Sequence, residues 1–124
     1  MIDTSPVDSV LGVPITLQKI FFYYDGPRMF SATDENGKLY LINSVDEDLV
    51  GDTKIDTYLA VEVQPDCESF VLNQVYSQSG VIKVDISYDT LNGILMQQDT
   101  ICETVPEELV PSSQETILMK NGVV

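Results

Sequence analysis

Two stretches of this chain, residues 57–63 and residues 81–87, alternate apolar side chains with other side chains at every second position. A period of two is the period of a β-strand, whose successive side chains point to opposite faces of a sheet. In the first stretch Leu59, Val61 and Val63 share one face. Because a helix would scatter these residues around its axis, the chain is predicted to fold around a β-sheet.

Further strands are predicted where apolar runs end at turn residues. Asp34-Glu35-Asn36-Gly37 separates two such runs, and Asn-Gly in that position is a strong signal of a β-hairpin. Residues 15–24 are apolar almost throughout after Lys19, which is typical of a strand covered on both faces, with a short helix as the alternative. The remaining strands are expected at residues 28–33, 38–43, 91–97 and 116–119, with residues 91–97 paired to residues 81–87.

One helix is predicted over residues 65–76. Pro65 suits the first helical turn, and the carboxylate of Asp66 favours the positive end of the helix dipole. At three turns the helix depends on tertiary packing. Its buried stripe would consist of Cys67, Phe70 and Val71, with Val75 as a further candidate.

The fold class that these elements predict is α+β, a mostly antiparallel sheet of about five strands with one or two short helices packed on it. A single helical turn between prolines is expected in residues 105–111, and residues 44–56 are interpreted as a polar, acidic connection. Residues 1–12 are expected to form a flexible N-terminal arm. Residues 13–124 would form a single α+β domain, because a chain of 124 residues has the usual size of one domain.

The ends and the cysteines of the chain indicate where it works. The first residues lack the basic start and apolar run of a signal peptide, and no apolar stretch has the length of a membrane span. Cys67 and Cys102 do not have the spacing of a zinc site or a disulfide framework, and each is expected to be a small buried residue. We therefore expect a cytoplasmic protein that does not bind membranes.

The charge of the chain is strongly one-sided. Its 20 acidic and 6 basic residues give a formal net charge of −14, and Lys83 is the only cation between Ile55 and Met119. A field of this sign repels nucleic-acid phosphates and anionic lipids and attracts basic proteins. The composition therefore excludes direct nucleic-acid binding and predicts a basic protein partner, with solubility as the alternative role of the charge.

The absence of histidine from the sequence limits the possible chemistry. Without histidine the chain has no Ser-His or Cys-His nucleophile pair and lacks the commonest zinc ligand. Its glycines form no phosphate-binding loop. Paired carboxylates could still supply acid–base chemistry, as in glycosidases, but among 20 acidic residues such pairs carry almost no specificity. We expect a protein that is not an enzyme, with no cofactor and no metal.

The segment from Asp46 to Asp52 partly matches a calcium-binding loop, because carboxylates and a glycine stand at some of the required positions. Asp46, Asp48 and Gly51 fit the pattern, whereas Val50 and Thr57 occupy positions that need oxygen ligands. The segment is therefore interpreted as a solvated acidic loop, with weak cation binding as the alternative.

Residues 21–31 concentrate five aromatic side chains around the turn Asp25-Gly26-Pro27. An exposed Tyr24 beside Arg28 is typical of an interface hot spot. In the other interpretation, Phe21, Tyr23 and Phe30 belong to the core, and Arg28 is a local charge partner of Asp25.

This stretch resembles a family of small bacterial proteins that share a Tyr-Tyr-Asp-Gly-Pro-x-x-Phe-Ser-type segment, followed by a hairpin with a glycine turn and a strand before a short helix. The resemblance covers about residues 19–76. It implies a small, compact bacterial domain and carries no activity with it.

These observations favour a small acidic interaction protein that binds and neutralises or inhibits a basic partner, in the manner of immunity proteins, antitoxins or anti-defence factors. A DNA mimic is the sharper version of this hypothesis. An accessory structural subunit of a larger bacterial assembly is the alternative, and a carboxylate-based hydrolase the remote one. The predicted partner-binding residues are Tyr24, Asp25, Arg28, Asp46, Glu47, Asp48, Asp52, Glu107 and Glu108.

Overall fold

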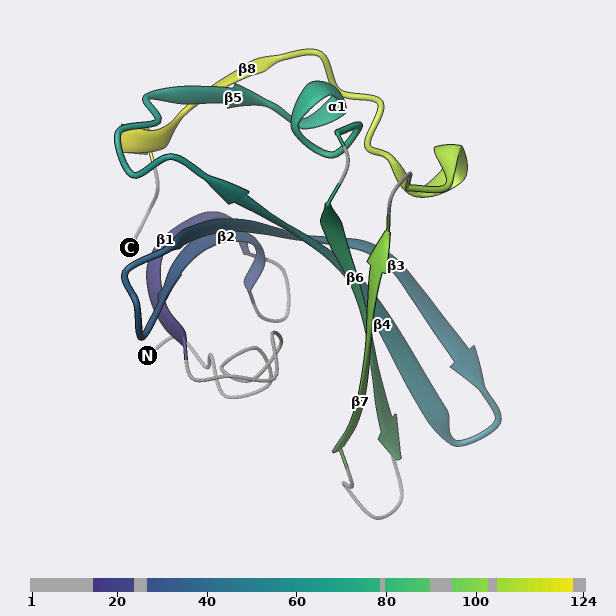
Figure 1. Cartoon of the computed structure of the whole chain (residues 1–124). Helices are drawn as coiled ribbons and strands as arrows, with labels where there is room; N and C mark the ends of the chain where they lie inside the picture. Colours follow the sequence, from purple (N-terminus) through teal and green to yellow (C-terminus); the bar gives the residue numbers. More distant parts are fainter. Residues whose placement is uncertain (1–14, 24–26, 79, 90–94, 103–104, 122–124) are drawn as a thin grey trace.

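The computed structural model describes residues 15–23, 27–78, 80–89, 95–102 and 105–121, which form a large and a small antiparallel sheet (Figure 1). The strand order of the large sheet is β1-β2-β3-β4-β6-β7, and the small sheet pairs β5 with β8. The strands are β1 (Ile15–Tyr23), β2 (Pro27–Asp34), β3 (Leu39–Val50), β4 (Thr53–Val63), β5 (Ser69–Val71), β6 (Val81–Asp89), β7 (Leu95–Cys102) and β8 (Thr116–Leu118). The helical segments are α1 (Leu72–Val75) and the 3-10 turns η1 (Glu107–Leu109) and η2 (Met119–Asn121).

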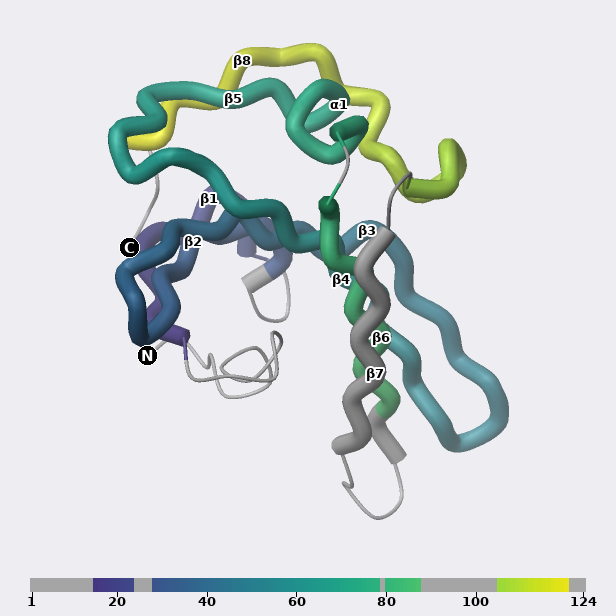
Figure 2. The backbone as a smooth tube through the Cα atoms, in the orientation of Figure 1, coloured from purple at the N-terminus to yellow at the C-terminus, as the bar shows by residue number. Residues whose placement is uncertain are grey.

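The backbone trace shows why strands β4 and β6 are neighbours although β5 and α1 separate them in sequence (Figure 2). After β4 the chain leaves the large sheet, forms β5 and α1 on one side of it, and returns as β6. The later segment containing η1 and β8 comes back to the same side, where β8 pairs with β5. The small sheet is therefore built from two distant parts of the chain.

The predicted hairpin between β2 and β3 is confirmed. The Asp34 carboxylate accepts hydrogen bonds from the backbone N–H groups of Asn36 (2.9 Å) and Lys38 (3.0 Å), which fixes the turn. Gly37 has a φ of +79°, a left-handed conformation that glycine adopts at little cost. The predicted pairing of the segment at residues 81–87 with the next strand is also confirmed, as β6 with β7. That strand is Leu95–Cys102 and not the predicted residues 91–97, of which residues 91–94 lie outside the described part of the chain.

The prediction of an acidic connection over residues 44–56 is wrong. This segment completes β3 and begins β4, and the two strands stay paired from Leu39↔Val63 to Val50↔Thr53. Gly51, with a φ of +61°, allows the reversal between them. Strand pairing continues into this segment because the backbone ladder needs no apolar side chains once the register is set by the buried part of the hairpin.

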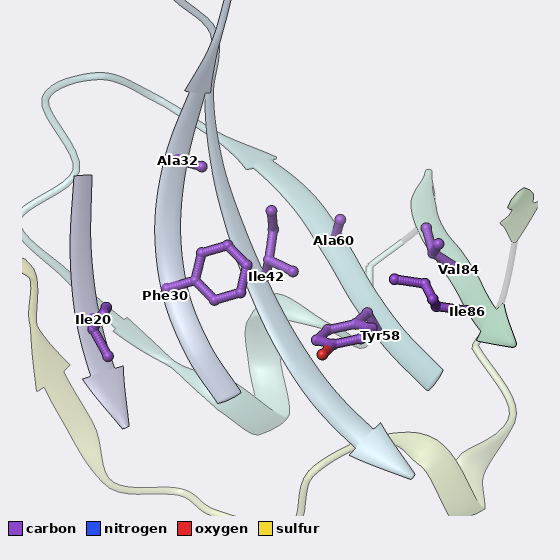
Figure 3. Packing of buried hydrophobic residues seen from close by; sticks show 8 residues of the cluster. All are labelled: Ile20, Phe30, Ala32, Ile42, Tyr58, Ala60, Val84 and Ile86. Carbon is purple, nitrogen blue, oxygen red and sulfur yellow. The ribbon is translucent and has the colours of Figure 1, made fainter. Parts of the chain in front are cut away.

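The large sheet buries apolar side chains on both faces, so that the adjacent β4 residues Tyr58 and Leu59 are buried on opposite sides. On one face lies the first apolar cluster (Figure 3), and on the other face the second, which packs against the small sheet. The edge-on contact of Phe21 with Phe70, with ring centroids 5.4 Å apart, joins β1 to β5 on the second face. The first apolar cluster consists of Ile20, Phe30, Ala32, Ile42, Tyr58, Ala60, Val84 and Ile86, and the second of Leu41, Leu59, Val61, Phe70, Tyr76, Val81 and Val105.

The predicted helix over residues 65–76 is largely wrong, because only Leu72–Val75 is helical. The preceding residues form β5, since pairing with β8 satisfies their backbone groups and buries Phe70. Cys67 is half-buried instead of part of a core stripe, and its thiol donates a hydrogen bond to the carbonyl of Ser69 (3.2 Å). The predicted terminal strand and the turn between prolines are confirmed as β8 and η1.

The mostly antiparallel sheet is therefore confirmed, while the helical share is much smaller than an α+β class suggests. Among the described residues, no helix has the length and apolar character needed to cross a membrane. The predicted arm at residues 1–12 and the side chain of Cys102 lie outside the residues and side chains that the structure describes.

Candidate functional site

Strands β3 and β4 extend well beyond the small sheet that covers their other ends (Figure 1). The distal part, residues 46–57, is named the acidic hairpin below. Its carboxylates Asp46, Glu47, Asp48 and Asp52 are exposed. At the tip, Leu49 is 66% exposed and Val50 is 60% exposed. Carboxylates thus surround two exposed apolar side chains.

The register of the acidic hairpin determines which carboxylates meet. Glu47 lies directly opposite Asp56, whereas Asp46 lies opposite Thr57. Like charges opposite each other destabilise an antiparallel pair unless a cation compensates them. Since adjacent side chains point to opposite faces of the hairpin, the Glu47–Asp56 pair and Asp46 belong to different faces.

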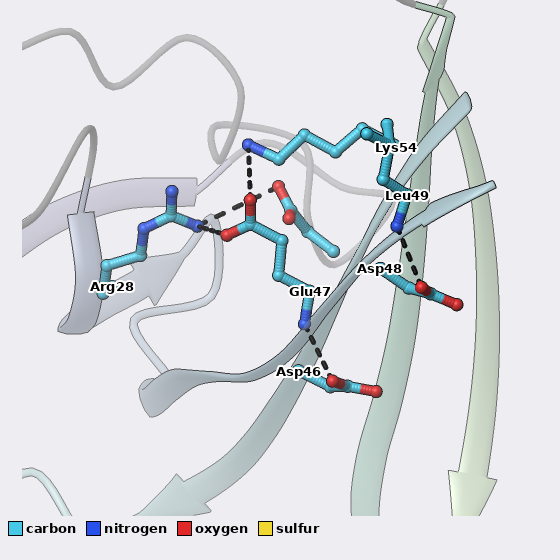
Figure 4. A network of polar contacts seen from close by, with 7 residues as sticks. Arg28, Asp46, Glu47, Asp48, Leu49 and Lys54 are labelled. Atoms are coloured by element: carbon cyan, nitrogen blue, oxygen red, sulfur yellow. Dashed lines mark hydrogen bonds and ion pairs between the residues drawn. The ribbon is translucent and has the colours of Figure 1, made fainter. Parts of the chain in front are cut away.

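Two cations compensate the Glu47–Asp56 pair (Figure 4). The Arg28 guanidinium lies 3.8 Å from the Glu47 carboxylate and 4.0 Å from that of Asp56. The Lys54 ammonium lies 3.3 Å from the other oxygen of Glu47. The Arg28 side chain is only 13% exposed, so the arginine from β2 ties the acidic hairpin to the sheet.

Tyr58 lies where the acidic hairpin meets the first apolar cluster. Burial and the carboxylate of Asp56 raise the pKa of the Tyr58 hydroxyl to about 12, although Arg28 acts in the opposite direction. The shift keeps the hydroxyl neutral to a higher pH than in an exposed tyrosine, and the hydroxyl lies between the ion pairs of the hairpin and the apolar core.

The opposite face of the hairpin carries a second polar group of contacts. The Thr57 hydroxyl donates a hydrogen bond of 2.7 Å to the carboxylate of Asp85, whose other oxygen lies 3.2 Å from the Lys83 ammonium. Asp46 and Asp48 each accept a hydrogen bond of 2.9 Å from the next backbone N–H. These local bonds orient the two carboxylates without neutralising them.

The structure brings together most of the residues that the sequence singled out. Asp46, Glu47, Asp48 and Asp52 share the acidic hairpin with Arg28 at its base. Glu107 and Glu108 are exposed in η1, and Glu108 lines a shallow depression with Ser44 and Val45 of β3. Tyr24 and Asp25 lie outside the described residues.

Sequence reasoning missed four participants, namely Leu49, Val50, Lys54 and Asp56. The signal was present in Gly51-Asp52, a dipeptide that is typical of the two-residue turn of a β-hairpin. The acidity of the segment concealed it, because charged runs are usually interpreted as connections.

The interpretation of the acidic segment as a solvated loop is corrected. Residues 46–50 belong to β3, and only Gly51 and Asp52 form the turn to β4. The segment is therefore an extended hairpin and not a loop wound around an ion. In the described ranges, no three acidic or cysteine side chains are grouped so that they could hold a metal.

The aromatic segment is divided between core and surface. Phe30 is fully buried and Phe21 packs on Phe70, as a core role requires. Tyr23, also expected in the core, is 45% exposed, and its neighbour Phe22 is 56% exposed. Both lie at the end of β1, an edge strand of the large sheet.

Comparison of the chain with models of protein families, with curated proteins and with solved structures gives no match. The resemblance to small bacterial proteins over residues 19–76 thus stays a prediction. The acidic hairpin is a candidate site on its own geometry and charge.

Proposed function

We propose that this protein is a small acidic, non-enzymatic binding protein of the bacterial cytoplasm that binds and neutralises a basic partner protein through the acidic hairpin. The observation that carries the proposal is the grouping of four exposed carboxylates around the exposed Leu49-Val50 tip. Carboxylates at such a site speed encounter with a cationic surface, and apolar side chains in their midst supply contact area.

The charge network at the base supports this role. Arg28 and Lys54 hold Glu47 in place, and the paired strands leave the hairpin backbone little freedom. A binding element that is rigid before it meets its partner loses less conformational entropy on binding. The hairpin therefore presents its carboxylates in a defined arrangement.

The partner that fits this surface has a cationic groove or channel with an apolar pocket for the tip. A toxin, a nuclease or a defence factor that acts on nucleic acid has such a surface, so binding there would inhibit it. In the DNA-mimic version of the proposal, the acidic hairpin occupies the nucleic-acid channel itself.

The test is capture of partners from extracts of the source organism at low and high salt, with two variants of equal charge. The hairpin variant carries Asp46→Asn, Glu47→Gln, Asp48→Asn and Asp52→Asn. The control variant carries Glu35→Gln, Glu62→Gln, Asp66→Asn and Glu115→Gln at other exposed positions. We expect a basic protein that dissociates at high salt and binds the hairpin variant at least about tenfold more weakly, while the control binds normally.

Equal loss of binding in both variants would show that only net charge matters, and would contradict a site at the hairpin. Addition of duplex DNA to the captured complex tests the DNA-mimic version, which requires that DNA displace this protein from its partner.

The exposed pair Phe22 and Tyr23 favours the second candidate, an accessory subunit that buries this aromatic surface against a permanent partner. Such a complex resists salt because its contact is apolar. The double variant Phe22→Ser/Tyr23→Ser would abolish that complex and leave binding through the acidic hairpin unchanged.

A further inference from the structure

A cleft lies away from the acidic hairpin, on the side of the large sheet that the small sheet covers. Its volume is about 730 Å³, within the range of about 300–1,000 Å³ that is usual for sites of small organic ligands. One wall comes from β1 and β2, and the other from the segment before β5 and from η2. A backbone hydrogen bond of 2.9 Å from Met119 to the carbonyl of Glu68 joins two parts of the second wall.

The charges in the cleft differ from those of the rest of the molecule. Arg28, Lys54 and Lys83 each form an ion pair with a carboxylate. Lys19 and Lys120 both line the cleft, and neither forms an ion pair with any residue that the structure describes. In a chain of net charge −14, two lysines from distant segments thus meet at one hollow, where Glu68 is the only described carboxylate.

The remaining lining is both apolar and polar. Leu39, Leu118 and Met119 supply apolar surface, and Ser31 and Thr33 supply hydroxyl groups. This combination of an apolar lining with a few polar and charged groups is typical of a site for an amphipathic small molecule.

We infer that this cleft binds an organic anion with an apolar body, whose acidic group lies between Lys19 and Lys120. An anion in this place gains from two cations that form no ion pair with a described carboxylate, and Glu68 offsets only one of the two positive charges. The apolar body gains from the surface of Leu39, Leu118 and Met119. The inference does not depend on the acidic hairpin.

The probe for the test is 8-anilinonaphthalene-1-sulfonate, an aromatic anion whose fluorescence rises in apolar surroundings. The native protein is titrated with it at low ionic strength, and the neutral N-phenyl-1-naphthylamine is the comparison probe. We expect saturable binding of the anion at one site, with amide NMR shifts at Ser31, Thr33 and Met119, and weaker binding of the neutral probe. Shifts confined to other parts of the chain would overturn the inference.

The variants Lys19→Gln and Lys120→Gln should each weaken anion binding roughly fivefold and leave the neutral probe unaffected. Lys54→Gln is the matched control, because it makes the same change in net charge on the acidic hairpin. Thermal unfolding of each variant confirms that it is folded. Equal weakening in all three variants would overturn the inference, since it would show a response to net charge alone.

Competition separates the two parts of the proposed ligand. Decanoate should displace the fluorescent anion, whereas inorganic phosphate at the same concentration should not, because it has no apolar body. Equal displacement by both would show a site that responds to charge only, which contradicts the inference.

Discussion

The two halves of the β3–β4 hairpin share one ladder of backbone pairing and differ in almost everything else. In the proximal half, which the apolar clusters cover, Leu41 and Leu59 are buried on one face of the sheet and Ile42 is buried on the other. In the distal half, the tip residues Leu49 and Val50 are mostly exposed among carboxylates. The same secondary structure therefore rests on burial in one half and on backbone pairing and ion pairs in the other.

This difference shows where stability and recognition are located. Apolar burial stabilises the proximal half, so changes to the buried side chains there lower stability. The distal half contributes little burial, so its side chains are available for contact with a partner. Ion pairs at its base take over part of the role that burial has in the proximal half.

The largest expected effect on stability comes from replacing one leucine by alanine in each half and comparing the two variants. Leu59→Ala should lower the free energy of unfolding by about 2–5 kcal/mol, because it leaves a cavity at a fully buried position. Leu49→Ala, the matched control at the tip, should change it by less than about 0.5 kcal/mol. Urea unfolding measures both, and similar losses at the two positions would remove the distinction between the halves.

The next effect lies at the border between the halves, where the pKa of Tyr58 is raised to about 12 from its ordinary 10.0. A raised pKa favours the neutral form in the folded state, so its contribution is complete below pH 10 and disappears as the pH rises toward 12. We expect the free energy of unfolding to fall by on the order of 2 kcal/mol between pH 10 and pH 12 because of Tyr58.

The measurement is urea unfolding from pH 9 to 11.5, for the wild type and for Tyr58→Phe. The variant should lose less stability over this range. Tyr76, whose pKa is raised by burial, contributes to both proteins equally and cancels in the difference. Parallel pH profiles would contradict a raised pKa of Tyr58.

The smallest effect concerns the ion pairs at the base of the acidic hairpin. Arg28→Met should lower the free energy of unfolding by about 1–2 kcal/mol at low salt, because Glu47 and Asp56 then face each other without the guanidinium. Adding Glu47→Gln should restore part of the loss. Lys38→Met, at an exposed lysine with no ion pair to a described residue, serves as the control. Additive effects of Arg28→Met and Glu47→Gln would show that the pair does not interact.

Much of the sheet could be predicted from local patterns. The Asn36-Gly37 turn and the alternation at residues 57–63 and 81–87 gave strands that the structure confirms, because turn chemistry and period are properties of short segments. The helix over residues 65–76 failed because pairing of Ser69–Val71 with β8 depends on a segment some fifty residues later. No local propensity reveals that partner.

The candidate sites also divide into features that a short segment reveals and features that depend on distant segments coming together. The carboxylates of the acidic hairpin were recognisable as a group because they are adjacent in sequence. Their charge partner was not, since Arg28 is distant from Glu47 and Asp56 in sequence and comes beside them only through strand pairing. The expected pairing of Arg28 with Asp25 concerns a residue outside the described part of the chain. The cleft was invisible to sequence reasoning because Lys19 and Lys120 stand at opposite ends of the chain.

The sequence by itself determined a sheet-rich chain of strong negative charge, without the histidine that many catalytic mechanisms need. These properties depend on composition and on patterns within a few residues. Only the tertiary structure decided that an acidic segment is a hairpin instead of a loop, that Arg28 ties it to the sheet, and that two lysines share a cleft. The reason is physical: strand pairing and ion pairs join groups that are close in space, and that closeness arises only when the whole chain has packed.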